Sequence, residues 1–143
     1  MSKTRMTPKI LLTSILVLNL LSCTPVLKIE LASSTETVPN PRFTITEINE
    51  PAACRSANKN PQIDTVQLLL EDDTVLWHIR ATGINNVGEI TYGVTPPGFF
   101  VEVEPAELTA GPTYILEVRG NGADRFKFIV GTDGVIIPYP WGS

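Results

Sequence analysis

The chain has 143 residues, of which 43% are apolar and 18% charged, and its 11 Lys and Arg face 15 Asp and Glu. This length suits one domain with a hydrophobic core, and the composition is unlike that of a disordered chain. The acidic balance argues against a nucleic-acid-binding protein. One histidine and two cysteines leave little material for a zinc site or a histidine-based catalytic triad.

The first 22 residues have the pattern of an export signal. Lys3, Arg5 and Lys9 precede an apolar run over residues 10–21. Such a run is too short to span a ~30 Å hydrocarbon layer, which needs about 20 apolar residues. It suits the hydrophobic region of a signal peptide, so we expect residues 1–22 to be removed.

The apolar run ends in Leu20-Leu21-Ser22-Cys23, which resembles the lipobox of bacterial lipoproteins. The resemblance implies cleavage before Cys23, diacylglycerol on its thiol and usually an acyl chain on its amine. Two or three acyl chains give stable anchoring, because each buried methylene adds ~0.8 kcal/mol. An uncleaved anchor, or an ordinary signal peptide followed by a chance cysteine, is the alternative.

These residues predict a lipid-anchored protein of the bacterial cell envelope, with the membrane as its partner through Cys23. Thr24 stands where the enterobacterial sorting rule uses aspartate for retention, which implies the outer rather than the inner membrane. After processing, 8 basic residues face 15 acidic ones, a net charge of −7 (8 − 15). Cys54 then has no partner in the chain, which leaves an inert thiol, an intermolecular disulfide or a reactive site.

Beyond the leader, no window of eleven residues keeps a helical apolar period. Short strands with Gly, Pro or Asn between them predict an all-β antiparallel sandwich or barrel of about seven or eight strands. The expected strands cover residues 43–48, 63–70, 74–82, 88–94, 99–104, 113–119, 125–130 and 135–137.

The domain is expected over residues 43–143, after a lipidated cysteine and tether over residues 23–42. The polar run and the prolines of that segment favour a tether that holds the domain away from the membrane. The alternative is that residues 26–31 form an edge strand of the domain itself.

Three landmarks resemble immunoglobulin-like sandwiches, especially fibronectin type III modules. Trp77 lies in a strand where such modules often bury a tryptophan, and Tyr92 falls in the next strand. Leu108, Gly111 and Tyr114 have the spacing of the tyrosine corner, in which the phenol folds back onto an upstream backbone group. The resemblance implies the sandwich and transfers no function, because the scaffold serves many.

The residues that could carry chemistry form no recognised motif. His78 has no nucleophile motif beside it, and the acidic runs at residues 71–73 and at Glu102, Glu104 and Glu107 lack EF-hand spacing. We interpret them as solvated turns and strand faces. The prediction is therefore a protein with no catalytic residue, no metal and no cofactor.

Aromatic residues near two turns are the candidates for partner binding. Phe99 and Phe100 cannot both point inward on a regular strand, so one of them is exposed, lies at a bend or packs against a partner. Tyr139 and Trp141 lie in a proline-rich tail that either folds back to cap the sandwich or is offered to a partner groove.

The leading functional hypothesis is a lipid-anchored, non-enzymatic envelope sandwich that presents a binding or structural surface to an envelope protein or glycan. The alternative is an anchored inhibitor or accessory protein of a hydrolase or envelope complex, with residues 96–100 as the inhibitory loop. An enzyme is the third hypothesis and depends only on the acidic pairs.

Overall fold

Apolar and polar residues alternate along most of the strands. The computed structural model describes residues 24–50 and 57–140, and these residues form ten strands and no helix. Within the same residues, no helix is long and apolar enough to cross a membrane. The predictions made for Cys23, Cys54 and Trp141 lie outside the described residues.

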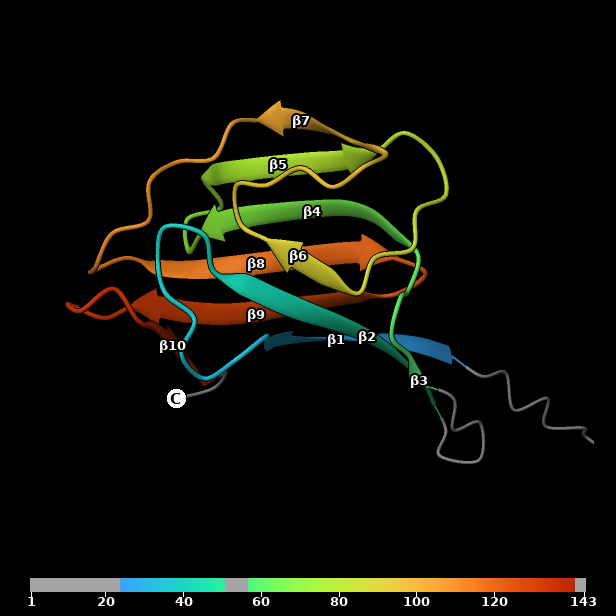
Figure 1. The fold of residues 1–143 in the computed structure, drawn as a ribbon, viewed down its shortest axis with the longest axis horizontal. Coiled ribbons are helices and arrows are strands. Elements are labelled where there is room, and N and C mark those ends of the chain that lie inside the picture. Colours follow the sequence, from blue (N-terminus) through green and yellow to red (C-terminus); the bar gives the residue numbers. More distant parts are fainter. Residues whose placement is uncertain (1–23, 51–56, 141–143) are drawn as a thin grey trace, which may run out of the picture.

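The strands form two antiparallel sheets (Figure 1). In the smaller sheet β2 pairs with β1 along one edge and with β3 and β6, end to end, along the other. The larger sheet has the order β10-β9-β8-β4-β5-β7. The bounds are β1 Thr24–Leu31, β2 Arg42–Glu50, β3 Ala57–Asn58, β4 Ile63–Leu70, β5 Val75–Ala81, β6 Glu89–Thr91, β7 Phe99–Val103, β8 Thr113–Gly120, β9 Ala123–Val130 and β10 Ile136–Pro138.

The strand order is that of an immunoglobulin-like sandwich. If β1, β2 and β6 are lettered A, B and E, and β4, β8 and β9 are lettered C, F and G, the order is A-B-E opposite C-F-G. Strands β5 and β7 extend the larger sheet beyond C, and β10 extends it beyond G. The predicted fold class is confirmed, with ten described strands where seven or eight were expected.

The core fills the space between the sheets with side chains from alternate positions. Trp77 is fully buried and meets Tyr92 edge-on, with ring centroids 5.1 Å apart. On the other side of the core Phe128 stacks on Tyr114 at 5.4 Å. Phe128 also meets Phe43 of β2 in the opposite sheet, with ring centroids 5.6 Å apart, so Trp77–Tyr92 and Phe43–Phe128 both join the two sheets.

The tyrosine corner is present. The Tyr114 hydroxyl accepts a hydrogen bond from the Thr109 N–H at 2.9 Å and donates one to the Thr109 carbonyl at 3.1 Å. Leu108 is buried beside it. The corner ties the loop before β8 to the strand that follows.

Strand β5 departs from a regular burial pattern at Val75. Alternation places Val75 on the same face as Trp77 and Ile79, but Val75 is 37% exposed whereas the other two are fully buried. The β4–β5 register shifts between Leu68 and Leu69, and the resulting β-bulge turns the start of β5 outward.

Residues 24–42 were expected to form a tether outside the domain, but they belong to the folded domain. Strand β1 pairs with β2 along its whole length and buries Leu27 and Ile29 in the core. In the following segment, buried Glu36 accepts hydrogen bonds from the Arg42 N–H and guanidinium at 2.8 and 2.9 Å. The described domain thus begins at Thr24, and the alternative of an edge strand is the correct one.

The fold predicts a clear difference between two tyrosines. Tyr114→Phe removes the corner hydrogen bonds and should lower the free energy of unfolding by about 1 kcal/mol. Tyr139→Phe, which changes an exposed ring, is the matched control and should leave the free energy of unfolding unchanged.

Trp77→Ala truncates a core side chain and should lower the free energy of unfolding by ~3–5 kcal/mol. Urea unfolding measures all three, and parental midpoints for Tyr114→Phe and Trp77→Ala would contradict the corner and the core.

Candidate binding surface

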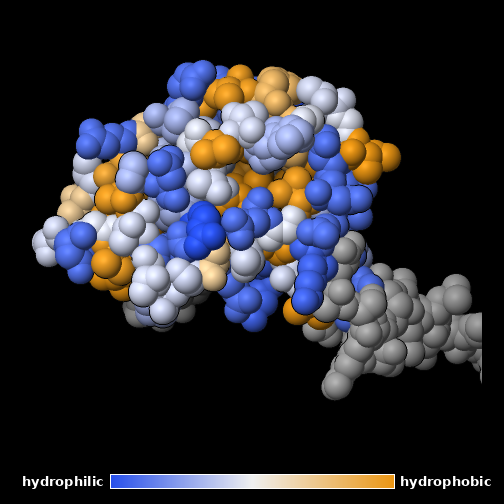
Figure 2. Space-filling model, in the orientation of Figure 1, coloured by the Kyte–Doolittle hydropathy of each residue, from blue (hydrophilic) through white to orange (hydrophobic). Residues whose placement is uncertain are grey.

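Apolar and polar residues are mixed on the face of the protein that Figure 2 presents. No broad apolar patch stands out there. Three features of the surface could contact another molecule: the outer face of the larger sheet, the sheet edges and a groove beside β2.

A row of polar side chains crosses the outer face of the larger sheet. The pairing places Arg125, Glu117, Gln67 and His78 opposite one another on β9, β8, β4 and β5. A neighbouring row contains Arg119, Thr65, Arg80 and Phe100 in the same way. Register alone therefore gathers arginines from three strands on one face.

Glu117 is the centre of this face and is only 2% exposed. Its Oε1 accepts hydrogen bonds from Gln67 Nε2 at 2.8 Å and Arg119 Nε at 2.9 Å, and its Oε2 accepts one from Arg125 Nε at 2.6 Å. Burial alone would raise the pKa of Glu117, but these three donors outweigh burial and lower it. The carboxylate is held ionised with its oxygens occupied, which suits a structural role.

A second group of polar and charged side chains lies beside the row. Glu102 Oε2 lies 3.2 Å from His78 Nδ1, and Glu102 Oε1 lies 3.4 Å from Arg80 Nη1. His78 is a partly exposed strand residue, as expected, and the pairing of Glu102 was not foreseen from the sequence. Among the described residues, no group of three or more His, Cys, Asp and Glu could hold a metal ion.

The edges of the sheets differ in how they are protected. At the outer edge of β1, the Ile29 N–H donates to Asp124 Oδ2 of β9 at 2.8 Å. The edges at β3 and β6 are two and three residues long, and β10 is three residues long and ends in Pro138. Short strands, prolines and capping side chains all discourage strand addition.

Strand β7, five residues long, forms the edge of the larger sheet beyond β5. It pairs only with β5 and lies at the rim of the larger sheet (Figure 1). Phe99 points into the core at 9% exposure, whereas Phe100 is 41% exposed and lies opposite Arg80. The prediction that one of the two phenylalanines is exposed is confirmed for Phe100.

Tyr139 lies at the other edge of the same sheet. Its N–H donates to the Lys127 carbonyl at 2.8 Å, and Lys127 Nζ is 4.9 Å from the centre of its ring. The beginning of the tail therefore folds back on β9, and the ring stays partly exposed. The structure does not bring Tyr139 together with Phe100.

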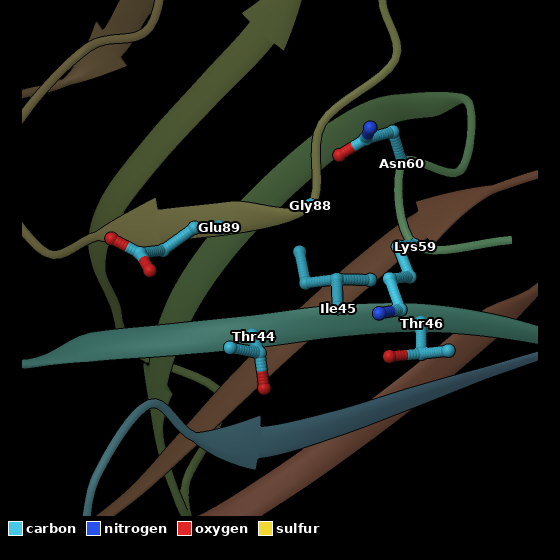
Figure 3. A pocket seen from close by; sticks show the side chains of 7 residues that line it. All are labelled: Thr44, Ile45, Thr46, Lys59, Asn60, Gly88 and Glu89. Carbon is cyan, nitrogen blue, oxygen red and sulfur yellow. The ribbon is translucent and has the colours of Figure 1, made fainter.

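A groove of ≈ 490 Å³ lies beside β2, where β3 and β6 meet end to end (Figure 3). Thr44, Thr46 and Asn60 offer hydrogen-bonding groups, and Lys59 and Glu89 add one charge of each sign. Gly88 allows the junction, because a Cβ there would collide with the Lys59 carbonyl. No sequence pattern indicates this groove, because it depends on which edge of β2 the strands β3 and β6 share.

Comparison of the chain with protein-family models, with curated proteins and with solved structures finds no match. A function can therefore be argued only from the described site. That site offers an open strand edge, one exposed aromatic ring and exposed arginines, which are features of binding to another molecule.

The buried carboxylate predicts a pH dependence of stability. Because the folded pKa of Glu117 is below its ordinary value, folding favours the ionised form. Its contribution is complete above about pH 4.3, the ordinary glutamate pKa, and is lost as the pH falls through the lowered folded pKa. The pKa of Glu36 is shifted in the same direction, because hydrogen bonds from Arg42 and Ser33 outweigh burial.

Glu117→Gln should thus cost about 2 kcal/mol at pH 7 and reduce the loss of stability toward acid pH. Urea unfolding at several pH values measures both effects. Glu107→Gln, at an exposed position, is the control and should match the parent at pH 7. A parental acid profile for Glu117→Gln would show that the carboxylate is not stabilised in the folded state.

Proposed function

We propose that this chain is a lipid-anchored, non-enzymatic binding protein of the bacterial cell envelope. The observation that carries the binding role is the open edge of β7 with Phe100 exposed beside it. The anchor is supported by the basic start, the apolar run and the lipobox-like sequence that ends at Cys23.

The partner that suits this edge is an extended segment of an envelope protein. Such a segment can add to β7 as a further strand, with backbone hydrogen bonds for affinity and side-chain contacts for specificity. Phe100 supplies a rigid aromatic contact, and Arg80 opposite it supplies a guanidinium. Both residue types are enriched among those that dominate interface energies.

The alternative is an anchored inhibitor of a hydrolase, and the loop over residues 96–98 favours it. The Gly98 carbonyl accepts hydrogen bonds from the Thr82 N–H at 2.8 Å and from Asn85 Nδ2 at 3.1 Å. The Phe99 N–H donates to the Pro96 carbonyl at 3.2 Å. A loop held in one conformation loses little entropy on entering an enzyme cleft. Inhibition of one purified hydrolase at a stoichiometric ratio would distinguish this role.

The anchor is tested by Cys23→Ala. We expect this variant to lose metabolic labelling with palmitate and to leave the membrane fraction, because the thiol and the new amine carry the acyl chains. Cys54→Ala is the control and should keep both the label and the membrane location. Equal labelling of the parent and Cys23→Ala would contradict the proposed anchor.

The binding edge is tested by site-specific photo-crosslinking in intact cells. A benzophenone amino acid at position 100 should give one saturable crosslink to an envelope protein. The same group at position 26 is the control, because Val26 is equally exposed at 41% on β1. With the purified partner, Phe100→Ala should weaken binding by about 30-fold, or roughly 2 kcal/mol. The same crosslinks from both positions would contradict a specific edge.

A further inference from the structure

The proposed anchor joins the fold without a spacer. Cys23 immediately precedes Thr24, which is the first residue of β1 and is paired with Glu50. The end of the sandwich at which β1 begins must therefore lie within a residue or two of the acyl chains. The absence of a spacer limits how the domain can be oriented on a membrane.

Four described segments lie at the same end of the sandwich as the start of β1, and we call them the β1-start end. They are residues 59–62, 82–88, 96–98 and 121–122. Figure 1 shows the connections between strands at this end gathered on the side where β1 begins. The opposite end, which we call the far end, consists of residues 32–41, 71–74, 104–112 and 131–135.

Close backbone approaches join the β1-start end into one surface. A Cβ at Gly122 would lie 3.0 Å from the Pro25 carbonyl oxygen of β1, and the Asn121 N–H donates to the Gln62 carbonyl at 3.3 Å. Gln62 in turn forms a β-bridge with Asn86. The surface is therefore continuous from the first residues of β1 to the loop after β5.

The two ends differ in charge. The four segments of the β1-start end contain one charged residue, Lys59, and no Asp or Glu. The four segments of the far end contain seven Asp and Glu and no Lys or Arg. Strands near either end carry both signs, so the asymmetry belongs to the loop tips. An anionic lipid surface repels the far end and tolerates the β1-start end.

The β1-start end also carries Ile84, which is 80% exposed. Its loop is held on both sides, because the Asn85 carbonyl accepts from the Ile63 N–H at 2.9 Å and the Thr82 N–H donates to Gly98 at 2.8 Å. A single exposed isoleucine is common on protein surfaces, but this one lies on the uncharged end beside the anchor.

We infer that the β1-start end rests on the lipid headgroups and that Ile84 enters the bilayer interface. The inference depends on the proposed acylation of Cys23. An apolar side chain at the interface adds to the affinity of the acyl chains and fixes the orientation that they alone would leave free. The acidic far end then points away from the membrane.

The test uses tryptophan as a depth probe in the full acylated protein. Ile84→Trp and, as control, Val94→Trp are bound to vesicles of phosphatidylethanolamine and phosphatidylglycerol, with or without brominated acyl chains. Val94 is 52% exposed and follows Gly93, which packs against Asn40 and Pro105 of the far end. The parent protein supplies the background from Trp77 and Trp141, and mass spectrometry reports the acyl chains on Cys23.

We expect brominated lipid to quench the added emission of Ile84→Trp and to leave that of Val94→Trp unchanged. Equal quenching of the two variants, or none in Ile84→Trp, would overturn the inference while the acyl mass on Cys23 upholds the anchor. Absence of that mass would overturn the proposed anchor, and this inference with it.

Discussion

Strand β8 is buried on both faces, and the rest of the sandwich depends on it. Tyr114, Leu116 and Val118 point into the core, while Ile115 and Glu117 are buried on the outer face. A carboxylate can be buried in that position only if donors replace the water it loses. The arginines of β8 and β9 and the glutamine of β4 supply them, so the pairing of these three strands is fixed by charge as well as by backbone hydrogen bonds.

The buried polar contacts at Glu117 hold the centre of the sandwich together, and the surfaces that could contact other molecules lie at the strand edges and loop tips. Asp124 caps the backbone of β1, while the edge at β7 stays open beside Phe100. One end of the sandwich is nearly free of charged loop residues, and the other carries seven carboxylates in its loops. The proposed partner at the β7 edge and the proposed contact with lipid use different parts of this periphery, so one molecule can make both.

Local patterns predicted much of the fold. Alternation located β2, β4 and β8, and the spacing of Leu108 and Tyr114 located the corner, because each depends on neighbours in sequence. The docking of β1, the bulge that exposes Val75 and the groove beside β2 depend on register between distant segments. Alternation alone predicted that one of Phe99 and Phe100 is exposed. The donors around Glu117 come from three strands, and Gln67 lies 50 residues away from it.

With Cys23 acylated as we propose, the domain sits directly on the membrane with the β1-start end toward it. Neutron reflectometry of the acylated protein on a supported anionic bilayer measures this arrangement without any substitution. We expect one protein layer in contact with the headgroups. A layer of solvent between the headgroups and the protein would contradict it.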